Sequence, residues 1–323
     1  MSNVEAAPQE VVCAEGPAAV ELVEPRDVPL GGPRAMTVRR TLPRRKRSLI
    51  GAWCFVDHYG PDRVSATGGM QVPGHPHTGL QTVSWLFEGE IEHRDTTGAH
   101  AAVRPGELNL MTAGSGIAHS EFSTPGTDVL HGAQLWLALP RAHRQAAPAF
   151  EHYAPPQTGT RGAQLRVFLG SLGSETSPVA TFSPLLGAEI VLDPGARLRL
   201  PVEESFEHGV LVDTGSVDVG GVTAGAGRLA YLPPGRSSVE AHADTSAGAR
   251  LLLLGGEPLN ERIVMWWNFI GSDHDEIAAY RRQWQDERSD PSRRDRRFGD
   301  FPEAWTATLP APELPNARLI PRE

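Results

Sequence analysis

Short apolar runs separated by Gly- and Pro-containing turns recur through most of the chain. In the first half they include TVSWLFEGEIEHR (82–94), AAVRPGELNLMTAG (101–114) and HGAQLWLALP (131–140). Turn signals such as EGE (88–90), TTG (96–98) and RPGE (104–107) follow one another at about ten-residue intervals. Many short strands at even spacing are typical of a β-barrel or a β-sandwich, so the sequence predicts an all-β fold.

A second set of such runs extends from residue 163 to 256, with comparable turn chemistry in DPG, DTGS and PPG. A polar, proline-bearing stretch at 141–160 separates the two sets. The 323 residues are enough for two domains, so we expect two diverged copies of one barrel type. The predicted domains are an N-terminal extension (1–34), a first barrel (35–150), a second barrel (151–260) and a C-terminal helix with an extended tail (261–323).

The segment 272–287 has a different pattern from the strands. Ser272 and Asp273 are candidate N-caps, and Ile277, Tyr280 and Trp284 follow at helical spacing. One short amphipathic helix is therefore predicted here.

Charge and cysteine content limit the function classes. A net charge of −9 and a pI near 5.8 give no electrostatic basis for binding nucleic acid or a membrane surface. The basic residues between 39 and 47 are interleaved with Thr, Leu, Pro and Ser, which favours a strand or turn pair with solvated arginines. Cys13 and Cys54 cannot form a disulfide framework, and no run approaches the roughly 18 apolar residues of a membrane span. With no Lys or Arg before Arg26, the N-terminus is unlike a secretory signal, and we expect a cytoplasmic protein.

Two pairs of residues have the composition of a metal site. His75 and His77 are two apart, as are His119 and Glu121, and a glycine-rich turn precedes each pair. Residues i and i+2 of a strand share a face, so both pairs can project into one barrel interior. Three imidazoles and a carboxylate suit Fe(II), Mn, Ni or Cu with open positions, whereas four-coordinate Zn would be closed and structural. The alternative interpretation is that these histidines are solvated surface residues that bind no metal.

The remaining histidines have less distinctive surroundings. We expect His58 to cap a turn, His93 to hydrogen-bond near a strand end, and His208 to be structural, leaving the second barrel without a metal set. Five apolar residues could line a pocket, although core positions are commoner for such side chains: Phe55, Trp85, Met111, Phe122 and Trp136.

Several segments resemble the pirin family of bicupins. HPHTGLQTV resembles the pirin string HPHRGFETV, MTAGSGIAHSE resembles MTAGxGIxHSE, and GAQLWLALP resembles GLQLWVNLP. The segment GGEPLNERIVMWWNFIGSDHDEIAAYRRQW is similar to the closing part of bacterial pirins. The resemblance implies two cupin barrels of the jelly-roll (double-stranded β-helix) type, with one metal, usually iron, held by His75, His77, His119 and Glu121.

The chain departs from the family pattern in two of these segments. Thr78, Leu80 and Gln81 stand where pirins have Arg, Phe and Glu, and Ala138 stands where they have Asn. A glutamine cannot serve as a general base, so Glu121 becomes the candidate base, with Gln81 a candidate residue just behind the ligands.

Family activities imply two functions. One is metal-dependent dioxygenation of a small aromatic substrate, such as the flavonol quercetin. The other is non-enzymatic, iron-dependent regulation through a protein partner. We expect one divalent metal, Fe(II) first, with Mn, Ni, Cu or Zn as alternatives, in a monomer. A cupin-type sugar-phosphate isomerase is less favoured because no phosphate-binding Lys/Arg constellation is evident.

Overall fold

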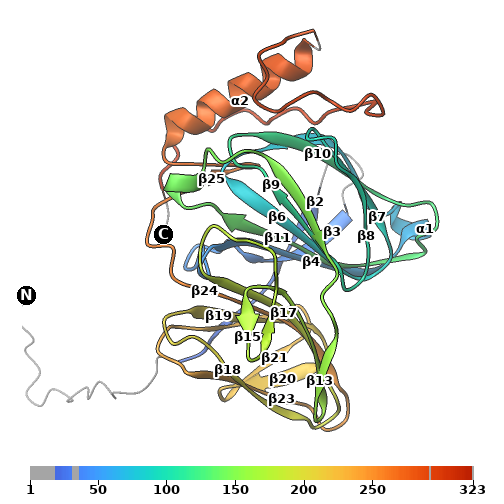
Figure 1. Ribbon diagram of the computed structural model, residues 1–323, viewed down its shortest axis with the longest axis vertical. Coiled ribbons are helices and arrows are strands. Elements are labelled where there is room, and N and C mark those ends of the chain that lie inside the picture. Colours follow the sequence, from blue (N-terminus) through green and yellow to red (C-terminus); the bar gives the residue numbers. More distant parts are fainter. Residues whose placement is uncertain (1–18, 31–35, 291, 322–323) are drawn as a thin grey trace, which may run out of the picture.

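The evenly spaced apolar runs form the strands of two β-barrels that lie one above the other along the long axis of the molecule (Figure 1). The computed structural model describes residues 19–30, 36–290 and 292–321. It confirms the prediction of an all-β fold with two tandem barrels and a short C-terminal helix. Cys13 and most of the predicted N-terminal extension lie outside the described residues.

Each barrel pairs a seven-stranded sheet with a four-stranded sheet. In the first barrel the large sheet contains, in spatial order, β12 (Ala149–Tyr153), β9 (Leu108–Thr112), β6 (Leu80–Glu88), β11 (Val129–Ala138), β4 (Trp53–Arg63), β3 (Met36–Leu42) and β2 (Arg26–Leu30). The small sheet contains β5 (Gln71–His77), β10 (Ile117–Ser123), β7 (Ile91–Asp95) and β8 (His100–Val103).

The second barrel repeats this arrangement. Its large sheet contains β1 (Glu21–Val23), β22 (Leu229–Leu232), β19 (Glu207–Thr214), β24 (Ala249–Gly256), β17 (Leu185–Leu192), β14 (Ala163–Leu169) and β13 (Thr158–Thr160). Its small sheet contains β18 (Arg197–Pro201), β23 (Ser238–Ala243), β20 (Ser216–Val219) and β21 (Val222–Gly225). The short elements are α1 (Val64–Thr67), η1 (Arg141–His143), the pair β15 (Ser171–Leu172) and β16 (Glu175–Thr176), and the pair β25 (Val264–Trp266) and β26 (Phe269–Gly271).

The two large sheets share one hydrophobic core between the barrels. Trp85 of β6 stacks on Phe168 of β14 with ring centroids 4.5 Å apart. The indole Nε1 of Trp53 donates to the carbonyl oxygens of Leu186 (3.2 Å) and Gly255 (3.1 Å) in the second barrel. Strands that are covered on both faces need apolar residues on both, which explains runs such as LLLL at 251–254.

The pairing of the strands near the predicted domain boundaries shows which barrel each of them joins. Within the predicted extension, β1 pairs with β22 of the second barrel and β2 pairs with β3 of the first. Strand β12 pairs with β9 of the first barrel, and β13 pairs with β14 of the second. The domain boundaries themselves stay predictions.

The predicted helix forms α2 (His274–Ser289) and lies at the outer end of the first barrel (Figure 1). Asp273 is its N-cap, because its carboxylate accepts a hydrogen bond from the backbone N–H of Glu276 (2.9 Å). Ile277, Tyr280 and Trp284 are buried against a cluster that includes residues of the C-terminal segment, defined as residues 292–321. This segment thus returns over the first barrel.

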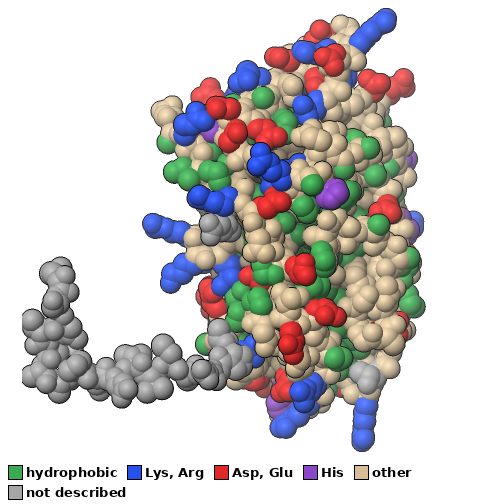
Figure 2. Space-filling view, turned by 60° about the vertical axis from the view of Figure 1, so that its left-hand side comes forward, with side chains coloured by type: hydrophobic (Ala, Val, Ile, Leu, Met, Phe, Trp, Pro, Cys, Tyr) green, Lys and Arg blue, Asp and Glu red, His purple; other side chains and the backbone are tan. Residues whose placement is uncertain are grey.

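Acidic and basic side chains are scattered among apolar ones over the face shown in Figure 2. Within β3 and the turn that follows, two of the arginines are paired: Arg40 with Asp57 at 2.6 Å and Arg47 with Glu21 at 3.0 Å. Among the described residues, no helix is long and apolar enough to cross a membrane.

Candidate metal centre

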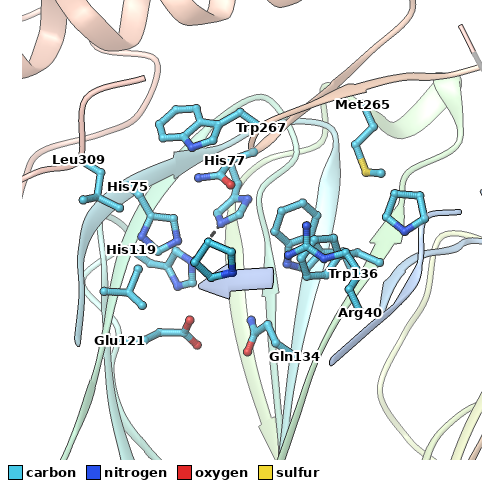
Figure 3. A pocket seen from close by; sticks show the side chains of 15 residues that line it. Arg40, His75, His77, His119, Glu121, Gln134, Trp136, Met265, Trp267 and Leu309 are labelled. Carbon is cyan, nitrogen blue, oxygen red and sulfur yellow. Dashed lines mark hydrogen bonds between the residues drawn. The ribbon is translucent and has the colours of Figure 1, made fainter. Parts of the chain in front are cut away.

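Strands β5 and β10 lie side by side and carry the two predicted ligand pairs. His119 is directly opposite His75 in the register, and a bulge follows before Glu121 pairs with Val72. The strand period of two places His75 and His77 on one face of β5, and His119 and Glu121 on the matching face of β10. Figure 3 shows these side chains pointing toward one another in the barrel.

The three imidazoles converge on one point. The Nε2 atoms of His77 and His119 are 3.1 Å apart, and candidate ligand atoms of His75, His77 and His119 all lie within 4.8 Å of one another. His75 donates from Nδ1 to the carbonyl oxygen of Pro73 (2.9 Å), which leaves the lone pair of its Nε2 available. The structure therefore brings together the three predicted histidines.

Burial controls the protonation of these rings. It lowers the pKa of His75 to about 4, and it lowers the pKa values of His77 and His119 well below the ordinary range. Neighbouring imidazoles lower the last two further. All three rings are therefore neutral at neutral pH, which is the form that coordinates a metal.

Glu121 supplies a carboxylate beside the imidazoles. One candidate ligand atom each of Glu121, His93 and His119 lies within 4.8 Å of the others. Burial raises the pKa of Glu121, although a hydrogen bond from the Ser84 hydroxyl (3.1 Å) acts in the opposite direction. A buried carboxylate with a raised pKa is stabilised by a cation, so the donor set of neutral imidazoles and one carboxylate fits a divalent transition metal.

His93 and Asp95 also face this centre, a role that the sequence interpretation missed for His93. They lie on β7, where Asp95 pairs with His119 and His93 pairs with Glu121 across the ladder with β10. The Nδ1 atom of His93 is 3.4 Å from Nδ1 of His119, and its Nε2 is 3.0 Å from the Asp95 carboxylate. The signal was present as a third i, i+2 pair, His-x-Asp, in a predicted strand.

A cavity of about 370 Å³ opens over the imidazoles (Figure 3). Phe55 and Trp136 form one wall as a stacked pair with ring centroids 4.0 Å apart, and Trp136 meets His77 edge-on at 5.1 Å. The β25–β26 hairpin contributes Trp267 to the rim, and the C-terminal segment contributes Leu309. Trp267 has a positive φ of 52°, an uncommon conformation for a bulky residue, and it lies in the loop that faces the pocket.

Two of the five candidate lining residues, Phe55 and Trp136, do line the cavity. Trp85 lies in the core between the barrels and Met111 in a core cluster of the first barrel, whereas Phe122 is 40% exposed. Trp85 does not line the cavity because it is on the face of β6 that points toward the second barrel.

Gln81 lies on that same face of β6. Its side-chain amide donates to the Thr112 hydroxyl (2.9 Å), and its strand neighbour Val83 belongs to the core between the barrels. Gln81 is not among the residues that line the cavity, whereas Gln134 is. Ala138 is buried in the cluster that contains Trp136. A catalytic influence of Gln81 stays a prediction.

His58 does not cap a turn, contrary to expectation, because it lies within β4 and reaches the second barrel. Its Nε2 is 2.6 Å from the Asp213 carboxylate, and His131 approaches the same oxygen at 2.5 Å. Arg250 donates to the other Asp213 oxygen (2.5 Å) and Arg39 donates to His58 Nδ1 (3.2 Å). The guanidinium groups of Arg250 and Arg39 already contact this cluster, and their positive charges repel a metal cation. The cluster is therefore a hydrogen-bonded link between the barrels.

Comparisons with known proteins agree with the arrangement. Family models described as "Pirin" and "Pirin C-terminal cupin domain" match residues 35–137 and 187–290. A Pseudomonas aeruginosa protein provisionally named as a quercetin 2,3-dioxygenase is 41% identical over 297 residues, which cover 92% of this chain and 91% of that protein. A pirin-like protein of Caulobacter vibrioides is 35% identical, covering 77% and 88% of the two chains.

A crystal structure of quercetin 2,3-dioxygenase from Acinetobacter baumannii superposes with a TM-score of 0.85 and 36% identity, covering 92% of this chain and 96% of that one. Both barrels are thus matched in sequence and in structure. The chain belongs to the pirin family, with a cupin fold in each of its two barrels.

Proposed function

We propose that the protein is a metal-dependent dioxygenase acting on a flavonol or a related phenol, with Fe(II) at the His75, His77, His119 and Glu121 site. The observation that carries the proposal is the convergence of three buried, neutral imidazoles within 4.8 Å at an aromatic-walled cavity. The names of two similar proteins, from Pseudomonas aeruginosa and Acinetobacter baumannii, support this substrate class.

The side chains around the cavity suit a planar phenol. A redox-active divalent metal, when bound, supplies the electron transfer between a phenol and dioxygen. The Phe55 and Trp136 pair offers an aromatic surface on which a ring can stack. The Gln134 side chain can hydrogen-bond a ring substituent, and Trp267 adds a further aromatic group at the rim.

Glu121 is the proposed base. Its carboxylate has two oxygens, so one can accept the proton of a phenolic hydroxyl while the other faces the metal. The Ser84 hydroxyl lies between Glu121 (3.1 Å) and the side-chain oxygen of Gln134 (3.0 Å), and it can donate to only one of them at a time. Ser84 can therefore turn toward Gln134 when Glu121 holds the proton.

Oxygen uptake tests the proposal. Protein loaded anaerobically with Fe(II) is mixed with quercetin and a series of simpler phenols, and oxygen consumption is followed with an electrode. We expect consumption that requires both metal and phenol and that is lost in Glu121→Gln. A protein that holds the metal but consumes no oxygen with any phenol contradicts the proposal and favours the regulatory, partner-binding alternative.

A cytoplasmic monomer completes the proposal. The chain has two cysteines, and Cys54 is a buried free thiol, so the protein does not depend on a disulfide framework, which suits a reducing compartment. Among the described residues, the exposed large hydrophobic side chains are Phe122 and Ile320, too few for an apolar self-association surface.

A further inference from the structure

Three side chains form a line from a surface turn to the metal centre. Asp95 Oδ2 lies 3.0 Å from Nε2 of His93, and Nδ1 of His93 lies 3.4 Å from Nδ1 of His119. All three residues are at least 97% buried. On its other side, His119 presents Nε2 to Nε2 of His77, 3.1 Å away, and its ring lies beside that of His75.

The turn that follows β7 fixes Asp95. Its Oδ1 accepts hydrogen bonds from the backbone N–H of Thr97 (2.8 Å), the Thr97 hydroxyl (2.6 Å) and the backbone N–H of Ala99 (3.2 Å). With Oδ1 fully used, Oδ2 is left for His93. The carboxylate therefore has one orientation and one remaining partner.

The His93 ring is fixed as well. It stacks on Phe150 of β12 with ring centroids 4.8 Å apart and an interplanar angle of 27°. Both of its nitrogens have a partner, the Asp95 carboxylate at Nε2 and His119 at Nδ1. Rotation of the ring would break both contacts.

These contacts determine which nitrogen carries each proton. An ionised carboxylate only accepts, so in the neutral form of His93 the ring proton is on Nε2 and Nδ1 is the acceptor. The His119 nitrogen facing it must then be the donor, Nδ1–H. A neutral imidazole with Nδ1–H has its lone pair on Nε2, the nitrogen that faces His77.

We propose that Asp95 and His93 are positioning residues that hold His119 in the Nδ1-protonated form, with its Nε2 lone pair directed at the metal. The inference rests on the metal site of the proposed function and concerns affinity for the metal, not turnover. Hydrogen-bond partners behind a metal-binding histidine typically change metal affinity by about 10- to 100-fold when removed.

The other two ligands are held differently. His75 donates from Nδ1 to a backbone carbonyl, which no side-chain substitution removes. Nδ1 of His77 has no side-chain partner among the described residues, and the group beside that ring is the Asn268 backbone, which no side-chain substitution removes. Among the three histidines, only His119 is held by side chains, so substitutions of such supporting side chains should change metal affinity mainly through His119.

Three substitutions separate positioning from simple packing. In Asp95→Asn the amide oxygen stays toward the two backbone N–H groups of the turn, so the amide NH₂ faces Nε2 of His93. That ring must then carry its proton on Nδ1, which pushes the His119 proton to Nε2 and blocks its lone pair. His93→Leu removes both contacts, whereas His93→Gln retains a carbonyl acceptor for His119 and an N–H donor for Asp95.

The experiment measures Mn(II) affinity by electron paramagnetic resonance of the free ion, on the full-length chain. Asp95→Asn and His93→Leu are expected to weaken binding by about 10- to 100-fold, and His93→Gln to restore most of it. Long-range proton–nitrogen NMR of the metal-free protein should show Nδ1–H at His119 in the parent and a shift toward Nε2–H in Asp95→Asn. A merely structural effect would not change this tautomer.

Each other outcome overturns the inference in a distinguishable way. If the parent protein does not bind Mn(II), that result contradicts the proposed metal site and therefore also the inference. A parent that binds while all three variants bind within about twofold of it refutes the positioning role alone. Normal affinity in Asp95→Asn, with loss in both His93 variants, would make His93 a ligand instead. If Asp95→Asn fails to fold, the contrast between His93→Gln and His93→Leu decides.

Discussion

The Nε2 atoms of His77 and His119 lie 3.1 Å apart on neighbouring regions of one sheet, in a place from which water is largely excluded. Two lone pairs at this separation repel each other unless a proton or a cation lies between them. Burial lowers the pKa of both rings and so disfavours the doubly protonated imidazolium, which leaves a single neutral N–H of one ring or a metal ion to fill this position. The sheet therefore holds the two nitrogens in an arrangement that a metal ion stabilises.

Metal binding should stabilise the fold through these histidines. Free metal at about 100 times its dissociation constant adds about 2.7 kcal/mol to the free energy of unfolding. We expect Mn(II) or Fe(II) to raise the melting temperature of the parent, and His77→Ala and His119→Ala to lose that increase. Differential scanning fluorimetry with and without metal measures it. His152→Ala, at a partly exposed position on β12, is the matched control and should keep the increase. An increase that persists in both ligand variants would contradict the site.

Replacing Glu121 with Gln should weaken both metal binding and turnover. The change keeps the shape of the side chain but removes the negative charge that lies beside His119. If Glu121 also accepts the phenolic proton, the rate should fall by about 10²- to 10⁴-fold at saturating metal. Metal titration and oxygen uptake on the same preparation separate the two effects. Retained turnover in Glu121→Gln would exclude Glu121 as the base.

Changes at Gln81 should affect stability and leave turnover nearly unchanged. Its amide bonds Thr112 on the strand face that points away from the cavity. Gln81→Ala should lower the free energy of unfolding by about 1 kcal/mol through the lost hydrogen bond. Gln81→Glu should cost more, because it buries a charge without a cationic partner. Urea unfolding and oxygen uptake measure the two properties. A large gain of activity in Gln81→Glu would show that the residue acts on the metal site after all.

The stability of the C-terminal segment should be coupled to that of β5, the strand of His75 and His77, through Gly74. The backbone N–H of Leu309 donates to the Gly74 carbonyl (2.8 Å), and a Cβ at Gly74 would lie 2.4 Å from the Trp305 ring. Gly74→Ala should therefore destabilise the protein by about 1–3 kcal/mol. The double variant Gly74→Ala/Trp305→Ala removes the clash, so a double-mutant cycle from urea unfolding should show strong coupling. Additive effects would mean that Trp305 does not pack on Gly74 in solution.

Acid should destabilise the second barrel through His208. Both of its ring nitrogens are buried without a hydrogen-bond partner among the described residues, and burial lowers its pKa to about 4. When the pH is below the unfolded-state pKa of about 6.5, His208 is protonated in the unfolded chain but stays neutral in the folded one. This contribution to stability is complete above pH of about 6.5 and declines as pH falls toward 4, by on the order of 3 kcal/mol.

His208→Leu should remove that contribution. Urea unfolding of the parent and the variant at several pH values between 7 and 4.5 gives two curves, and their difference isolates the histidine. We expect the variant to gain relative stability as pH falls. A difference that is constant across this range would show that His208 is not kept neutral by the fold.

Local sequence patterns were enough to predict α2 and the shared face of each of the two candidate ligand pairs. Asp273 and the helical spacing of Ile277, Tyr280 and Trp284 specify a capped amphipathic helix without reference to anything distant. The i, i+2 spacing of His75 and His77, and of His119 and Glu121, specifies a shared face as soon as each segment is extended. Two barrels followed from the repeated spacing of strands and turns.

The neighbours of each strand could be decided only by tertiary structure. The spacing of residues cannot show that β10 lies between β5 and β7, and this placement brings His93 and Asp95 behind His119. It also cannot show that the second barrel covers the outer face of β6, which directs Gln81 and Trp85 away from the cavity. Strand spacing determines which side chains share a face, because that depends on backbone geometry within one segment. What each face meets depends on contacts between residues far apart in the chain, and those arise only when the barrels close and pack together.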